Sequence, residues 1–226
     1  MFTKKQIWAL IIPLMIEQVL NALMGAADTM MVSNAGSAAI SAVSLVDSIN
    51  ILVLYVFTAM ATGGTIICSQ YIGHREEDMA CEAGKQLVLS VTALSVAVTI
   101  LCLLLRRPLL QLIFGSVEAD VMANSLTYFF ITALSYPFIA LYNSGAALFR
   151  TCGNSRLPLA ISTVANLINV IGNAIFIFGF HMGVAGAALS TLLSRVICAV
   201  AVMLCLRRPK QAIVVKDYFS ISPNMR

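Results

Sequence analysis

Three polar residues lie within an otherwise apolar stretch near the start of the sequence. Glu17, Asn21 and Asp28 fall within residues 6–32, a run long enough to cross a bilayer as a helix. At about 100° per helical residue, Asn21 lies about 40° and Asp28 about 20° around the axis from Glu17, so the three share one face. A carboxylate facing lipid costs at least about 2.5–3.5 kcal/mol. This face is therefore predicted to point into a helix bundle or a wet cavity.

Later apolar segments carry similar polar stripes. Asn166, Asn169 and Asn173 recur at i, i+3 and i+7, which is one face of a helix. Arg195 is interpreted as a structural partner of Asp47 or Glu17, and its alternative role is to tune the charge of a cavity. The predicted polar lining of the bundle consists of Glu17, Asn21, Met24, Asp47, Tyr136, Asn166, Asn169, Asn173, Thr191 and Arg195.

The chemistry available to this set is ion binding. A carboxylate, amide oxygens and a hydroxyl suit a hard monovalent cation, or a proton held on Asp28 because burial disfavours its charged form. Either species would neutralise Asp28 and so couple ion occupancy to helix packing. The sequence has no nucleophile with its base, no His/Cys ligand set and no Gly-rich phosphate loop, so we expect no enzyme and no cofactor beyond the coupling ion.

Composition sets the class of protein. The 226 residues are 60% hydrophobic and 11% charged, whereas soluble domains carry about 25% charged residues. The sequence predicts an all-α polytopic membrane protein with six transmembrane helices, at residues 6–32, 40–71, 87–105, 121–141, 159–178 and 184–206. Residues 74–85 are predicted to form a loop that leads into a helix, residues 149–158 a basic loop, and residues 207–226 a cytoplasmic linker. Pro137 is expected to bend the fourth helix and free a carbonyl.

Basic residues set the predicted orientation. The net charge is +4, but Lys and Arg lie at span ends, which argues against nucleic-acid binding and predicts cytoplasmic termini in the plasma (cell inner) membrane. Arg106 and Arg107 fall on the outer side. The basic residues placed inside are Lys4, Lys5, Arg75, Lys85, Arg150, Arg156, Arg207, Arg208 and Lys210.

Several separated motifs resemble one family. The segment PLMIEQVLNALMGAADTMMVSNAGSAAISAVSL resembles the first helix and turn of the multidrug and toxic compound extrusion (MATE) family. Further matches, in the same order, are ATGGTIICSQYIGHREEDMA, FRTCGNSRLP, NLINVIGNAIFIFGF and GVAGAALSTLLSR. The resemblance implies one six-helix lobe of a two-lobe antiporter that exports cationic or amphipathic drugs and toxins in exchange for sodium or protons.

The resemblance also implies an ion site. It would fall on Asp28, Asn169, Asn173, the carbonyl region of Ala187, and Thr191, and Ala187 enters from the resemblance alone. Many relatives have Asp where Asn173 stands, so this site would carry one carboxylate. Relatives have about twelve spans, so the sequence looks like an N-terminal half, either truncated or paired with a second lobe.

Two alternatives remain open at this point. One is a flippase of lipid-linked saccharides, for which a basic central cavity is expected and a single Arg195 does not provide one. The other is a transport-inactive or regulatory membrane subunit. Under each reading the bilayer is a partner, and under the favoured reading small-molecule drugs or toxins are as well.

Overall fold

The computed structural model describes residues 4–115 and 117–207, and this part of the chain is helical without strands. The helices are α1 (Lys4–Ser33), α2 (Ser37–Gly73), α3 (Glu77–Leu104), α4 (Arg106–Phe114), α5 (Ala119–Leu134), α6 (Tyr136–Thr151), α7 (Arg156–Asn173), the π-helical turn η1 (Ala174–Gly179) and α8 (Gly183–Leu206). Within the described residues five helices are long and apolar enough to cross a membrane, and the bent pair α5–α6, counted as one span, brings the number to six. The predicted all-α, six-span membrane fold is therefore confirmed.

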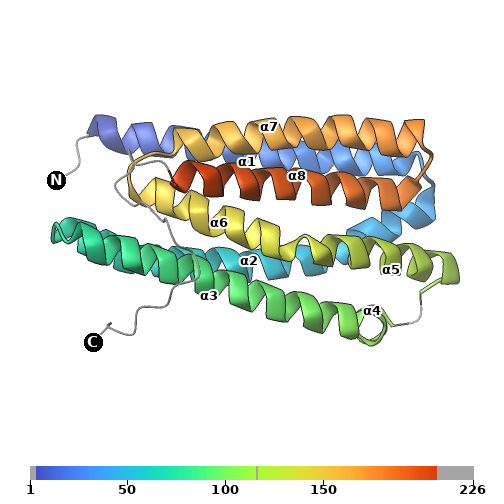
Figure 1. The fold of residues 1–226 in the computed structure, drawn as a ribbon. Helices are drawn as coiled ribbons and strands as arrows, with labels where there is room; N and C mark the ends of the chain where they lie inside the picture. The colour runs from blue at the N-terminus through green and yellow to red at the C-terminus, as the bar shows by residue number, and fades with distance from the viewer. Residues whose placement is uncertain (1–3, 116, 208–226) are drawn as a thin grey trace.

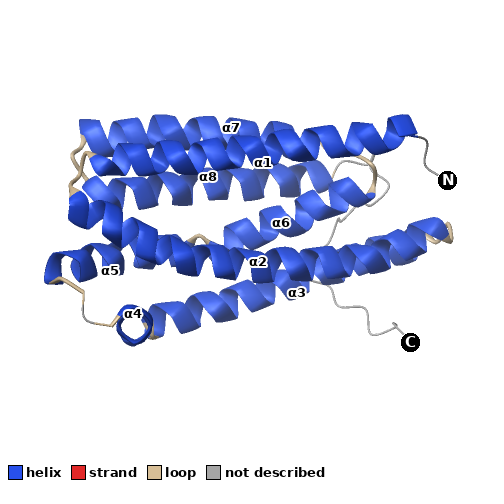
Figure 2. Cartoon of the chain, turned by 180° about the vertical axis from the view of Figure 1, so that it is seen from behind, coloured by secondary structure: helices blue, strands red, loops and turns tan. Residues whose placement is uncertain are grey.

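The spans form two layers joined by α6. Helices α1, α7 and α8 lie together, α2 and α3 lie along the other side, and α6 runs obliquely between them (Figure 1). Helix α1 packs mainly on α7 and has limited contact with α2. Seen from behind, α6 is visible between α1 and α2 (Figure 2). The attachment of α1 to the rest of the bundle therefore depends mostly on α7.

Two connections are shorter than the sequence indicated. Helix α3 begins at Glu77, with Glu77 and Asp78 in its first turn, where acidic side chains stabilise a helix N-terminus. Most of the charged segment predicted as a loop at 74–85 is therefore helix. Helix α6 continues to Thr151 and α7 begins at Arg156, so the predicted basic loop at 149–158 is reduced to a tight turn. The predicted linker, 207–226, lies outside the described residues except for Arg207.

The bend of the fourth span has an identifiable cause. Proline has no backbone N–H, so Pro137 leaves the carbonyl of Ala133 without its helical donor. The hydroxyl of Thr99 on α3 lies 3.3 Å from this carbonyl oxygen and can donate to it. The two halves meet at an angle of 44°. The expected bend and freed carbonyl are both confirmed.

Small residues allow close helix contacts. A Cβ added to Gly186 on α8 would lie 3.0 Å from the backbone carbonyl carbon of Phe176, and one added to Gly64 would meet the side chain of Leu87. Such positions let backbones approach where no hydrophobic force drives helices together in lipid. Gly63 differs, because a Cβ there would meet nothing within 4 Å.

These two kinds of glycine predict opposite stability effects. Gly186→Ala should lower the thermal unfolding temperature in detergent micelles, because overpacking against backbone typically costs about 1–3 kcal/mol. Gly63→Ala is the matched control and should raise it, because alanine favours a helix interior by up to about 1 kcal/mol over glycine. Equal effects of the two substitutions would contradict the proposed close contact between α8 and η1.

Candidate functional site

Polar pairs join α1 to α7 at a constant register. Asn166 Nδ2 donates to Asn21 Oδ1 at 3.0 Å, and Asn173 Nδ2 donates to Asp28 Oδ1 at 2.5 Å. The partners are seven residues apart on both helices, so the two helices run parallel with the same faces opposed. The stripe predicted on α1 therefore faces the asparagine stripe predicted on α7.

The members of these stripes that lie nearest Asp28 form a compact cluster around its carboxylate. An amide's oxygen and nitrogen are assigned from hydrogen bonding. The carboxylate of Asp28 can only accept, so the Asn169 amide is oriented with Nδ2 toward it. Nδ2 then donates to Asp28 Oδ1 at 2.8 Å and to Oδ2 at 3.2 Å, and Asn169 Oδ1 accepts from the Thr191 backbone N–H at 3.3 Å. Thr191 Oγ1 donates to the carbonyl of Ala187 at 3.0 Å. The structure thus brings together Asp28, Asn169, Asn173, Thr191 and Ala187.

One oxygen in this cluster has no hydrogen bond. Asn173 is fully buried, and its Oδ1 has no partner among the residues that the structure describes. Leaving a buried carbonyl oxygen unpaired typically costs about 1–3 kcal/mol. Carbonyl, carboxylate and hydroxyl oxygens are the ligands that hard cations prefer. The donor set therefore fits a small monovalent cation, or a proton on Asp28.

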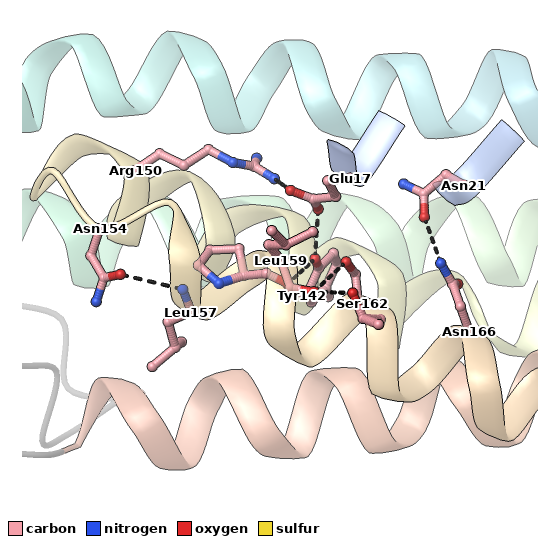
Figure 3. Close-up of polar contacts among 11 residues, drawn as sticks. Glu17, Asn21, Tyr142, Arg150, Asn154, Leu157, Leu159, Ser162 and Asn166 are labelled. Atoms are coloured by element: carbon pink, nitrogen blue, oxygen red, sulfur yellow. Dashed lines mark hydrogen bonds and ion pairs between the residues drawn. The ribbon is translucent and has the colours of Figure 1, made fainter. Parts of the chain in front are cut away.

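Glu17 belongs to a different cluster, although it shares the face of Asp28. Its carboxylate is 3% exposed, accepts from Arg150 Nη2 at 2.8 Å, and accepts from the Tyr142 hydroxyl at 2.9 Å (Figure 3). Glu17 and Asp28 are eleven positions apart, which is about 16 Å along a helix. Glu17 therefore ties α1 to α6 and does not join the Asp28 cluster.

A third cluster surrounds Asp47 on α2. Its Oδ1 accepts from Asn50 Nδ2 at 3.1 Å and from the Tyr128 hydroxyl at 3.2 Å. The Tyr136 hydroxyl donates to Asn50 Oδ1 at 2.7 Å. Tyr136, predicted to line a cavity, is fully buried and so belongs to the core.

Arg195 has a partner that the sequence did not suggest. Its Nη1 donates to Ser135 Oγ at 2.6 Å, at the bend between α5 and α6. Glu17 forms no ion pair with it within the described chain, which corrects the part of the prediction that named Glu17, and Asp47 makes no salt bridge with it among the described residues. The reason for the difference is that Arg150 already neutralises Glu17. Arg195 still interacts electrostatically with both Asp47 and Asp28.

The sequence model of one known family, described as MatE, matches residues 13–175. The chain belongs to the MatE family. MATE family members are transporters and not enzymes, which agrees with the expected absence of catalytic groups. The family is one of multidrug efflux transporters, and the helices described above make this member a multi-pass membrane protein.

Relatives in this family are similar along most of the chain. The chain is 29% identical to "Uncharacterized transporter YisQ" of Bacillus subtilis (strain 168), covering 87% of this chain and 44% of that protein. It is 27% identical to "Probable multidrug resistance protein NorM" of Thermotoga maritima, covering 87% of this chain and 43% of that one. The chain thus spans less than half the length of these two relatives.

A solved MATE structure has the same fold. An outward-facing multidrug resistance MATE family transporter of the MOP superfamily superposes with a TM-score of 0.90 at 23% identity. The match covers 97% of this chain and 49% of that one. The described helices therefore have the fold of one lobe of a MATE transporter.

Sequence reasoning missed three residues that hold these clusters. Asn50 lies one helical turn after Asp47, a spacing that could have identified it. Tyr142 lay just beyond the predicted fourth span, which ended at residue 141, and Arg150 fell in the predicted loop at 149–158, whereas both lie on α6. The apolar residues up to Phe149 were the available signal, because they extend the helix far enough to place Arg150 beside Glu17.

The Glu17–Arg150 pair predicts strong non-additivity. Arg150→Leu should destabilise the chain by about 2–4 kcal/mol, because it leaves a buried carboxylate uncompensated. Adding Glu17→Gln should recover much of this loss. The measurement is thermal unfolding in detergent for the two single variants and the double variant. Arg107→Leu is the control, because it makes the same change at an exposed arginine near a helix end, where surface substitutions usually change stability by less than about 0.5 kcal/mol. Additive losses in the double variant would argue against the pair.

Proposed function

We propose that this chain is the ion-binding lobe of a cation-coupled multidrug antiporter, and that Asp28 exchanges the coupling ion, sodium or a proton. The observation that supports this most directly is the cluster around Asp28. A carboxylate within an apolar span is held by two asparagines of α7, and the oxygen of one of them, Asn173, has no partner in the described chain. Intramembrane carboxylates commonly mark ion or proton pathways.

The same amides can serve two states of Asp28. An ionised carboxylate accepts the N–H groups of Asn169 and Asn173, which draws α1 onto α7. A neutralised Asp28 no longer requires those donors, so the two amides can turn and present their oxygens to a cation. Ion uptake would therefore replace the hydrogen bonds between α1 and α7. Because α1 depends on α7 for its attachment, this exchange supplies a physical route from ion occupancy to helix movement.

The charges inside the lobe favour a cationic substrate. When ionised, Asp28 and Asp47 place two negative charges against the one positive charge of Arg195, whereas Glu17 is neutralised by Arg150. This leaves one net negative charge for an organic cation to balance. A lipid-linked saccharide carries phosphate and would require the opposite sign, so the multidrug reading is favoured over the flippase reading.

The proposal includes a second lobe and an orientation. The relatives named above are more than twice as long as the matched segment, so we infer that drug export requires a partner lobe. We place both ends of the lobe at the cytoplasmic side of the plasma membrane, following the basic connections. Arg106, on the opposite side, lies over the ring of Phe130 at 5.2 Å, which gives this outward charge a local partner.

Asp28→Asn is expected to abolish specific ion binding. The amide keeps the size of the side chain but cannot neutralise a cation or hold an acidic proton. The measurement is equilibrium binding of radioactive sodium, together with proton uptake on acidification, by the chain reconstituted in lipid nanodiscs. Asp47→Asn is the matched control, since it removes another intramembrane carboxylate outside the cluster, and it should retain binding.

The outcomes separate the possible functions. Unchanged ion binding in Asp28→Asn would overturn the site. Ion binding that requires Asp28 but never supports dye efflux, even with a second MATE lobe co-expressed, would favour a regulatory subunit over a transporter.

Asn173→Asp should raise the affinity for sodium, which is the opposite of the effect expected for Asp28→Asn. A second carboxylate beside Asp28 disfavours an empty site, because two like charges at hydrogen-bond distance repel. Sodium affinity at neutral pH should therefore rise, by roughly ten-fold for about 1.4 kcal/mol of added attraction. Isothermal titration with sodium chloride, at ionic strength held constant with choline chloride, measures this. A lower affinity would mean that the Asn173 amide itself is required.

A further inference from the structure

One hydroxyl beside the Asp28 cluster bonds from one helix to another. Ser190 on α8 is 1% exposed, and its Oγ donates to the main-chain carbonyl oxygen of Asn169 on α7 at 2.6 Å. The other serines of these two helices, Ser162 and Ser194, donate to carbonyls of their own helices at 3.1 Å and 2.9 Å. A bond within one helix does not fix its neighbour. Ser190 therefore ties α8 to the backbone of a residue whose amide contacts Asp28.

A glycine leaves the space that this hydroxyl needs. A Cβ added to Gly172 on α7 would lie 2.5 Å from Ser190 Oγ and 3.2 Å from Ser190 Cβ. The first distance is too short for two atoms that are not bonded, so a side chain at position 172 would displace the hydroxyl. Gly172 is buried and stands directly before Asn173. Gly172 and Ser190 thus fit together at the level of the two asparagines.

This contact lies where the helical pattern changes. Helix α7 is a regular α-helix up to Asn173, and the π-helical turn η1 begins at the next residue. Asn169 and Asn173 therefore occupy the last regular turn. Single π-helical turns occur frequently at functional sites. A shift of one residue at this point would rotate the side chains by about 100° around the helix axis. A bond to the main chain of Asn169 holds this turn whatever the amide side chains bind.

We propose that Ser190 is a positioning residue of the ion site. Its hydroxyl holds the carbonyl of Asn169, and through it keeps the amides of Asn169 and Asn173 at the height and rotation that face Asp28. Ser190 acts through Asn169, as groups that orient the ligands of a metal commonly do. This inference rests on the ion site proposed above and adds the residue that sets its geometry.

Ser190→Ala removes the hydroxyl and keeps the Cβ. Sodium affinity, measured by isothermal titration of the chain in lipid nanodiscs at constant ionic strength, should fall by about ten-fold, the loss commonly seen when a group that orients a metal ligand is removed. Ser162→Ala is the matched control, because it removes a buried hydroxyl that donates within α7. It should bind sodium as the wild type does.

The same pair of variants tests a site that takes up a proton. Proton uptake that depends on Asp28 should reach half its maximum at a pH about one unit higher in Ser190→Ala, because N–H donors that lose their alignment favour the ionised carboxylate less. Asp47 and Arg195 also act electrostatically on Asp28, and both are unchanged in this variant. Uptake by Ser162→Ala should follow that of the wild type.

Gly172→Ala reaches the same bond from the other helix. Its methyl group should displace the Ser190 hydroxyl and change ion binding to a similar extent. The double variant Gly172→Ala with Ser190→Ala has no further bond to lose, so it should bind no more weakly than Gly172→Ala alone. Each single variant also replaces the other if one of them does not fold.

Thermal unfolding separates positioning from packing. Ligand binding to the folded state raises the unfolding temperature by mass action. A loss of positioning in Ser190→Ala should reduce the rise that sodium or acidification produces, and should leave the unfolding temperature in sodium-free choline chloride at neutral pH close to that of the wild type. A role in packing alone would lower the unfolding temperature without the ion and leave the rise unchanged.

The outcomes distinguish this inference from the ion site itself. If ion binding depends on Asp28 and both Ser190→Ala and Gly172→Ala leave it unchanged, Ser190 has no positioning role and the ion site stands. Equal losses in Ser190→Ala and Ser162→Ala would also overturn the role of Ser190. If the wild type binds ions no better than Asp28→Asn, the ion site fails and the positioning role fails with it.

Discussion

Intramembrane charge is the constraint on which the arrangement of this lobe depends. An ionised group in an apolar span is costly unless polar atoms or an opposite charge surround it. Each such group described here is tied to a different helix: Asp28 to α7, Glu17 to α6, and Asp47 to α5. Arg195 is tied to Ser135 at the bend. These bonds fix which helix faces which, in a medium where apolar packing alone discriminates weakly.

These polar bonds between helices are distributed unevenly over the bundle. Helix α1 has limited contact with α2, so its polar bonds to α6 and α7 carry much of its attachment. The bent span α5–α6 holds partners on several sides, through Tyr128 to α2 and through Arg150 to α1. Its angle follows from Pro137, and the Thr99 hydroxyl satisfies the carbonyl that this proline frees. A change in the bend would therefore alter more than one of the clusters.

Helical periodicity explains what could be read from the sequence and what could not. The angular position of Asp28, Asn169 and Asn173 follows from residue spacing, and their opposed faces were predictable. The position of a residue along the bundle axis does not follow from spacing, because it depends on the register between helices that are distant in the sequence. Glu17 has the correct angle for the Asp28 cluster but lies too far along the axis. Arg195 likewise bonds to Ser135 and not to Glu17, because Arg150 already pairs with Glu17. Only the folded bundle shows that Arg150 lies within reach of Glu17.

The asparagine at position 173 has a consequence for a site with one carboxylate. An amide side chain carries both an N–H donor and a carbonyl acceptor. Asn173 can therefore donate to an ionised Asp28 through Nδ2 and still offer Oδ1 to a cation. An aspartate there would offer only acceptors and would repel an ionised Asp28. The observed pair is therefore compatible with an empty site as well as an occupied one. An exchanger of the kind proposed above would pass through both states, and one amide at position 173 would serve Asp28 in the empty state and the cation in the occupied one.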